Sequence, residues 1–157
     1  MITRDDMEAF LPDLPEDCIE EFILTFKASI DPRLWVKLME EEYAELSAEK
    51  IGTKEHLKEA ADLMYVFEGF NLVAPDYLQL CVGEDELENI SDVLDKVAKA
   101  IDHAEGYYGH NVVYDAFLLV HDSNMSKLDE DGNPIFREDG KVLKGPNYRA
   151  PDLSFLI

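Results

Sequence analysis

Two stretches decide the fold prediction, KLMEEEYAEL at residues 37–46 and EAADLMY at residues 59–65. In both, carboxylates occupy positions of a helical pattern that otherwise suits burial. In the helix that contains the first stretch, residues spaced by three or four form one stripe: Trp35, Leu38, Glu42, Glu45 and Glu49. The stripe begins with core residues and continues into acids. This pattern indicates either the solvated face of an acidic helix or a site for a cation.

Capping and breaking residues around these stretches set the helix limits. Asp31 as N-cap and Pro32 in the first turn predict a helix that runs to about Lys50, before a stop at residue 52. Thr53 predicts the cap of the next helix, which continues until Pro75. The short loop between them makes the two helices antiparallel neighbours.

Three further helices are expected outside this pair. They cover residues 15–30, residues 85–105 and a segment that starts after Asn111 as N-cap and ends near residue 128. The sequence then becomes rich in turn signals, and residues 135–137 and 141–143 flank Glu-Asp-Gly as a small β-hairpin. The segment after Pro75 has no clear pattern.

The fold class predicted from these segments is all-α. We expect one domain over residues 1–157, with a helical core over about residues 15–127 and an irregular tail over residues 128–157. The core is a four-helix bundle with an extra N-terminal helix, and the tail carries the short β-hairpin.

Composition limits the classes of partner. The 157 residues include 46% hydrophobic residues, enough for a core, and 14 bases against 35 acids give a net charge of -21. Such a field repels nucleic acid and anionic lipid and attracts divalent cations, so neither nucleic acid nor a membrane is an expected partner. No apolar signal segment opens the chain, so the expected location is the cytoplasm.

The acids form two pairs with ligand spacing. Glu42 and Glu45, and likewise Glu59 and Asp62, are three residues apart on neighbouring antiparallel helices, so four carboxylates can gather. Oxygen ligands suit Mg²⁺ or Mn²⁺, and the histidine of the ExxH motif of di-iron bundles is missing from both pairs. The alternative, that Glu40 and its neighbours form a solvated face, stays open at this point.

The ExxE motif and the ExxD motif, joined by a short glycine-containing loop, resemble the metal signature of the all-α nucleoside triphosphate pyrophosphohydrolases, the MazG-like superfamily. The resemblance covers roughly residues 17–127. It implies that Glu42, Glu45, Glu59 and Asp62 hold two or three Mg²⁺ ions, which Mn²⁺ can replace. It also implies hydrolysis of a nucleoside triphosphate to the monophosphate and pyrophosphate. Glu41 would orient or deprotonate the attacking water, or touch an outer metal.

The C-terminal region extends this resemblance and adds bases. VHDSNMSK at residues 120–127 and REDGKVLKGPNY at residues 137–148 resemble the C-terminal half of MazG-like proteins common in phages, for which (d)GTP is the expected substrate. By analogy the substrate contacts are Asn124 and Lys127, followed by Lys141, Lys144 and Tyr148. Trp35 could stack on the base or could simply belong to the core.

Rival functions remain within and outside this superfamily. A phosphoribosyl-ATP pyrophosphohydrolase would share the metal cluster, and so would a house-cleaning enzyme acting on dUTP or dCTP. A non-catalytic acidic helical bundle that binds a protein would need no metal. The apolar content and the resemblance both predict a homo-oligomer, either a dimer or a tetramer.

Overall fold

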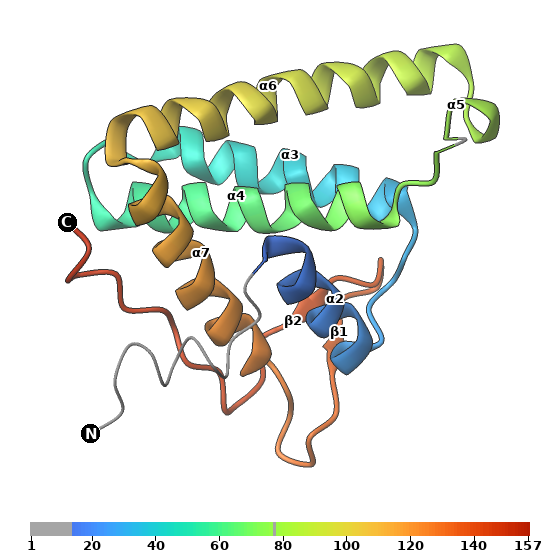
Figure 1. Cartoon of the computed structure of the whole chain (residues 1–157). Coiled ribbons are helices and arrows are strands. Elements are labelled where there is room, and N and C mark those ends of the chain that lie inside the picture. Colours follow the sequence, from blue (N-terminus) through green and yellow to red (C-terminus); the bar gives the residue numbers. More distant parts are fainter. Residues whose placement is uncertain (1–13, 77) are drawn as a thin grey trace.

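A computed structural model of the chain describes residues 14–76 and 78–157, and within them the fold is helical with a small C-terminal hairpin (Figure 1). The elements are α2 (Pro15–Phe26), α3 (Pro32–Ala48), α4 (Lys54–Val73), α5 (Leu78–Cys81), α6 (Glu84–Tyr108), α7 (His110–Met125), β1 (Ile135–Phe136) and β2 (Val142–Leu143). The all-α prediction and the terminal hairpin are confirmed. The segment after Pro75, which had no clear pattern, contains the short helix α5.

Helices α3 and α4 form the most extensive helix pair and run antiparallel (Figure 1). Their start signals are those that the sequence predicts. The Asp31 carboxylate accepts a hydrogen bond from the backbone N–H of Arg33 at 3.0 Å, and the Thr53 hydroxyl accepts one from that of His56 at 3.1 Å. Each cap satisfies a backbone donor that the first turn of a helix leaves free, which fixes where the helix begins.

Helix α4 is the centre of the core, because α2, α3, α6 and α7 all pack against it. Helix α6 runs along α3 and α4, and α7 descends from its end at a steep angle towards α2 (Figure 1). The buried residues of α4 lie on several of its sides: His56, Leu57, Ala60, Ala61, Leu63, Met64, Tyr65, Val66, Gly69 and Phe70. The EAADLMY stretch is therefore core sequence, and its acids lie at the edge of that core.

Several predicted boundaries differ from the structure. Helix α6 continues to Tyr108, beyond the expected end at residue 105, and α7 ends at Met125, before residue 128. Helix α2 ends at Phe26, four residues early, because Lys27 adopts a left-handed conformation with φ 51°. The released carbonyl of Ser29 then accepts a hydrogen bond from Trp35 Nε1 at 2.9 Å. Helix α7 begins at His110, so the prediction that Asn111 is its N-cap is wrong. Gly109, with φ 94°, holds the cap position without a side-chain bond.

The C-terminal tail is packed against the helices. Its strands pair antiparallel, with Ile135 opposite Leu143, and Val142 is buried. Further along, the Ser123 hydroxyl donates to the carbonyl of Arg149 at 2.6 Å, which ties the tail to the end of α7. In Figure 1 the hairpin lies below α3 and α4. This return path brings tail residues to the pair of helices that carries the acids.

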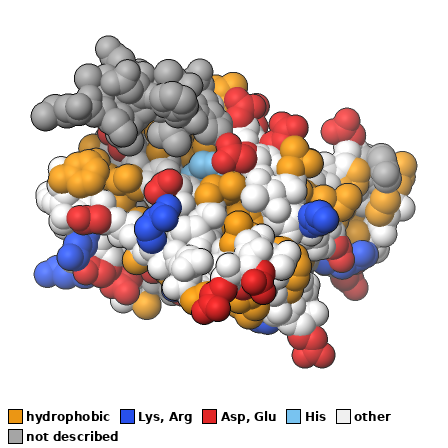
Figure 2. All heavy atoms as spheres, turned by 90° about the horizontal axis from the view of Figure 1, so that it is seen from below, with side chains coloured by type: hydrophobic (Ala, Val, Ile, Leu, Met, Phe, Trp, Pro, Cys, Tyr) orange, Lys and Arg blue, Asp and Glu red, His pale blue; other side chains and the backbone are white. Residues whose placement is uncertain are grey.

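Figure 2 shows acidic side chains scattered across the face seen from below, with few basic ones among them. Across residues 14–76 and 78–157, no helix combines the length and the apolar character that crossing a membrane requires.

Candidate active site

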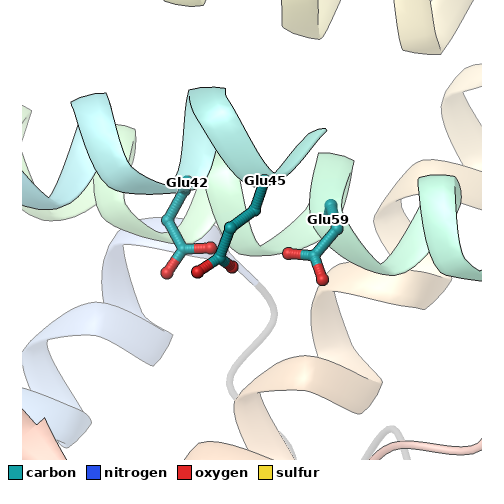
Figure 3. A group of neighbouring side chains, drawn as sticks. All are labelled: Glu42, Glu45 and Glu59. Carbon is teal, nitrogen blue, oxygen red and sulfur yellow. The ribbon is translucent and has the colours of Figure 1, made fainter. Parts of the chain in front are cut away.

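The predicted carboxylate cluster is present between α3 and α4. Each of Glu42, Glu45 and Glu59 offers one oxygen, and the three oxygens lie within 4.8 Å of one another (Figure 3). The first two residues are one turn apart on α3, and the third comes from the facing turn of α4. Three oxygens at this separation can coordinate one divalent cation, which is the chemistry that the spacing predicts.

Burial makes this cluster costly without a cation. One oxygen of Glu42 and one of Glu59, Oε2 in each, are buried and have no hydrogen-bond partner among residues 14–76 and 78–157. Burial, followed by repulsion from Asp62 and Glu45, raises the pKa of Glu42 to about 8. Burial and the charge of Asp62 likewise raise the pKa of Glu59 to about 7. Orphaned carboxylate oxygens and an all-oxygen donor set fit a hard divalent cation such as Mg²⁺ or Mn²⁺.

The fourth predicted ligand, Asp62, lies beside the cluster and has a different partner. Its Oδ2 is 2.8 Å from Nζ of Lys58, one turn earlier on α4, and the same ammonium is 3.4 Å from Glu59 Oε1. Burial opposes the charge on Lys58, but the two carboxylates outweigh it and raise the pKa of the ammonium above its usual value. Lys58 was not among the site residues predicted from the sequence, although its i,i+4 spacing to Asp62 is a signal for such an ion pair.

A cavity of about 470 Å³ opens beside the carboxylates. Its lining includes most of the residues that the sequence singles out for metal or substrate: Trp35, Glu42, Glu45, Asp62, Asn124, Lys127, Lys141, Lys144 and Tyr148. These positions are up to 113 residues apart in the chain, from Trp35 to Tyr148. The packing of α7 and the return of the tail bring them to one place.

Basic side chains occupy the tail side of this cavity. Burial lowers the pKa of Lys127 to about 8, against the opposing attraction of Asp62 and Glu42. Lys144 Nζ lies 4.8 Å from the centre of the Tyr148 ring, a cation–π distance. An anion entering the cavity would meet both ammonium groups and would favour the charged form of Lys127.

An apolar wall closes another part of the cavity. Trp35 is 3% exposed, and its indole lies against Gly69 so closely that a Cβ at that position would be 2.1 Å from Trp35 Cζ3. Phe22 and Leu38 also line this wall. Trp35 is therefore both a core residue and a cavity residue, and the two interpretations of it are compatible.

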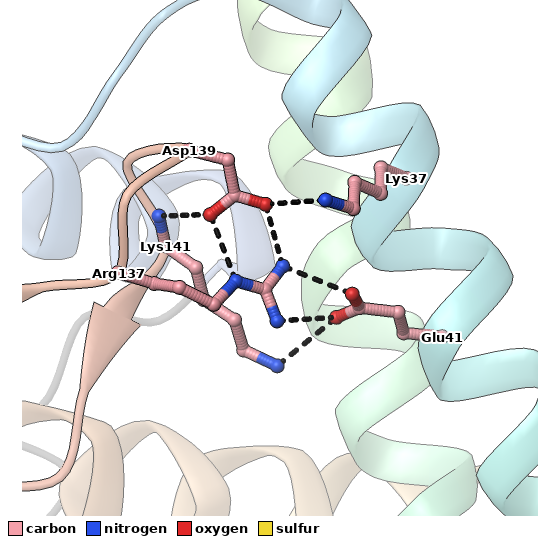
Figure 4. Close-up of polar contacts among 5 residues, drawn as sticks. All are labelled: Lys37, Glu41, Arg137, Asp139 and Lys141. Carbon is pink, nitrogen blue, oxygen red and sulfur yellow. Dashed lines mark hydrogen bonds and ion pairs between the residues drawn. The ribbon is translucent and has the colours of Figure 1, made fainter.

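Glu41 lies outside the carboxylate cluster and pairs with basic side chains of the hairpin. It accepts hydrogen bonds from Arg137 at 2.9 Å and from Lys141 at 3.2 Å, while Asp139 binds Arg137 at 2.6 Å and Lys37 at 2.7 Å (Figure 4). We call these five residues the hairpin clasp. Burial opposes ionisation of Glu41, but the hydrogen bonds from Arg137 and Lys141 outweigh it and lower its pKa. A carboxylate of this kind is a weak proton acceptor, so the geometry favours a role in holding the hairpin.

A second polar group lies deeper behind the cavity. Tyr65 lines the cavity, and its hydroxyl is 2.8 Å from Nδ1 of His121, a residue that is only 1% exposed. On the other side of the ring, Glu21 Oε1 lies 3.5 Å from Nε2, and no described residue hydrogen-bonds this nitrogen. Burial lowers the pKa of His121, so its neutral form is favoured. This pairing favours a structural role for His121.

In comparisons with known proteins, the chain matches no protein-family model, no curated protein and no solved structure.

Proposed function

We propose that the chain is a divalent-cation-dependent nucleoside triphosphate pyrophosphohydrolase of the MazG-like, all-α kind. The observation that carries the proposal is that one cavity is lined by carboxylates suited to a cation, by lysines suited to phosphate and by an apolar aromatic wall. A nucleoside triphosphate with its cation has a matching part for each: the cation, the phosphates and the base. A cavity of about 470 Å³ also lies in the usual range for small-molecule sites.

The carboxylates would hold the cation and the lysines would hold the triphosphate. Glu42, Glu45 and Glu59 are the ligands, and a cation bound there would lower the pKa of a water and polarise the α-phosphoryl group. Water oxygen then bonds to the α-phosphorus as the bond to the bridging oxygen breaks, which yields the monophosphate, pyrophosphate and a proton. Lys127 and Lys144 would contact the departing phosphates, where negative charge increases.

The base would lie on the apolar wall. Trp35 is held by its hydrogen bond to Ser29 and by its contact with Gly69, so its ring edge offers a rigid surface at little entropic cost. We propose (d)GTP as the substrate, as for the phage enzyme MazZ. The support for this choice is the resemblance of residues 120–127 and 137–148, and Asn124 in the first of these segments also lines the cavity.

The direct test is a product assay with purified protein, Mg²⁺ and each common ribo- and deoxyribonucleoside triphosphate. We expect monophosphate and pyrophosphate in equal amounts, without diphosphate, and the fastest turnover with dGTP and GTP. In water enriched in ¹⁸O the label should enter the monophosphate, because the attack is at the α-phosphorus. Release of orthophosphate or of a diphosphate would refute this reaction.

Two substitutions in α4 distinguish the loss of a metal ligand from the loss of a charge elsewhere on the same helix. Glu59→Gln removes a ligand charge and should abolish turnover, whereas Glu55→Gln makes the same change at an exposed position one turn earlier and should leave it intact. Absence of turnover with every nucleoside triphosphate, together with no heat stabilisation by Mg²⁺ and nucleotide, would favour the non-catalytic binding bundle.

A further inference from the structure

We propose that the ammonium group of Lys58 occupies the position between Glu59 and Asp62 where a second metal ion would otherwise bind. The nucleotide-free protein then binds one divalent ion at this site, on Glu42, Glu45 and Glu59. This inference rests on the metal-binding part of the proposed function, and it departs from the expectation of two or three ions. It concerns the protein before nucleotide binds, because a nucleotide brings a magnesium ion of its own.

The four carboxylates divide into two groups according to their partners. Glu42, Glu45 and Glu59 share the three-oxygen cluster, whereas Asp62 is outside it and contacts the Lys58 ammonium at 2.8 Å. Glu59 belongs to both groups. Its Oε1 is 3.4 Å from the ammonium, and its Oε2 is buried with no hydrogen bond to the part of the chain that the structure describes. The Glu59 carboxylate thus lies between the Lys58 ammonium on one side and the three-oxygen cluster, which needs a cation, on the other.

The position of Lys58 follows from the geometry of α4. Lys58 and Asp62 are four residues apart and therefore one above the other on the same face of the helix, and Glu59 is next to Lys58 in sequence. Both Lys58 and Asp62 line the cavity. The Lys58 side chain is only 32% exposed, and those of Glu59 and Asp62 are 14% and 16% exposed, so water screens these pairs less than it screens surface pairs.

A second divalent ion on Glu59 and Asp62 would have to displace this ammonium. Two cations cannot share the same carboxylate oxygens at contact distance, and moving the ammonium breaks two partly buried ion pairs. The ammonium supplies one positive charge permanently and requires no metal. It reduces the four negative charges of the group to three, and one divalent ion then leaves a single negative charge.

The test counts bound Mn²⁺ in the complete protein without nucleotide, because free Mn²⁺ gives an electron paramagnetic resonance signal that is lost on binding. We expect one site in the wild type. Lys58→Gln keeps a polar, slightly shorter side chain but removes the charge, and it should add a second site. Affinity at this position should increase by about tenfold or more, because the competing ion pairs are gone. Two ions sharing Glu59 should also show the spectrum of a magnetically coupled manganese pair.

Two further variants control for charge and folding. Lys58→Arg keeps a cation at the position and should bind one Mn²⁺, as the wild type does. Lys54→Gln removes the same charge from an exposed position one turn earlier on α4 and should also leave one site. Circular dichroism of each variant should match the wild type, so that a change in the count reports on the site.

The outcomes separate this inference from the proposed function. Two or more sites in the wild type, or one site in Lys58→Gln, would overturn the role of Lys58 and leave the hydrolase proposal intact. No Mn²⁺ binding to any variant would overturn the metal site itself and the proposed function with it.

Discussion

The substitution Glu42→Gln should stabilise the metal-free protein, although it removes a metal ligand. Glu42 has its pKa raised from 4.5 to about 8 by burial and by neighbouring carboxylates. Ionised Glu42 is therefore less favourable in the folded chain than in the unfolded one. The penalty is absent below pH 4.5, develops as the pH rises towards 8 and is complete above it.

The magnitude follows from the two pKa values. Each pKa unit between 4.5 and about 8 corresponds to about 1.4 kcal/mol, so full ionisation costs at most about 5 kcal/mol. Water that enters the cavity reduces this cost, and we expect about 2–3 kcal/mol from the substitution at pH 8.5. For a chain of this length that corresponds to an increase in Tm of roughly 5–10 °C.

The assay is thermal unfolding of the wild type and Glu42→Gln with EDTA at pH 5 and pH 8.5, followed by circular dichroism. The variant should unfold at a higher temperature at pH 8.5, and the difference should nearly vanish at pH 5. Addition of Mg²⁺ should stabilise the wild type and should have little effect on the variant. Glu40→Gln, an exposed change on the same helix, should give no such difference. A variant no more stable than the wild type at pH 8.5 in EDTA would refute the argument.

Three further substitutions test the surroundings of the site. Gly69→Ala places a methyl group against the indole of Trp35 and should destabilise the fold by about 1–3 kcal/mol in urea unfolding, because the core cannot accommodate it. Glu41→Gln removes the acceptor charge of the hairpin clasp and should make trypsin cleave the hairpin at least about tenfold faster, since local opening becomes easier. Tyr65→Phe leaves Nδ1 of His121 buried without its partner and should cost about 1–3 kcal/mol in urea unfolding.

Each of these three predictions has either a control variant or an outcome that would contradict it. Gly106→Ala, in α6, places its Cβ in open space and should stabilise slightly, which separates the close contact from the general effect of removing a glycine. Unchanged trypsin cleavage in Glu41→Gln would show that the clasp does not hold the hairpin. An unchanged stability of Tyr65→Phe would mean that water replaces the lost hydroxyl.

The sequence determined the local structure of this protein, because its signals act within a few residues. The caps of α3 and α4 at Asp31 and Thr53 are confirmed, and so is the hairpin around the Glu-Asp-Gly turn. The i,i+3 spacing of Glu42 and Glu45 predicted that they lie on one face of their helix, and their oxygens do lie close together. Hydrogen bonds of a helix turn and side chains one turn apart depend only on the neighbouring residues.

Only the tertiary structure decided how these parts combine. The early end of α2 at Phe26 depends on a left-handed Lys27 and on the hydrogen bond from Trp35, which the apolar pattern does not encode. The pairing of Glu41 with Arg137 joins residues 96 positions apart. The burial that raises the pKa of Glu42 requires neighbouring elements to cover it. Contacts over such separations depend on how whole helices pack, and helical spacing specifies which face is apolar but not what covers it.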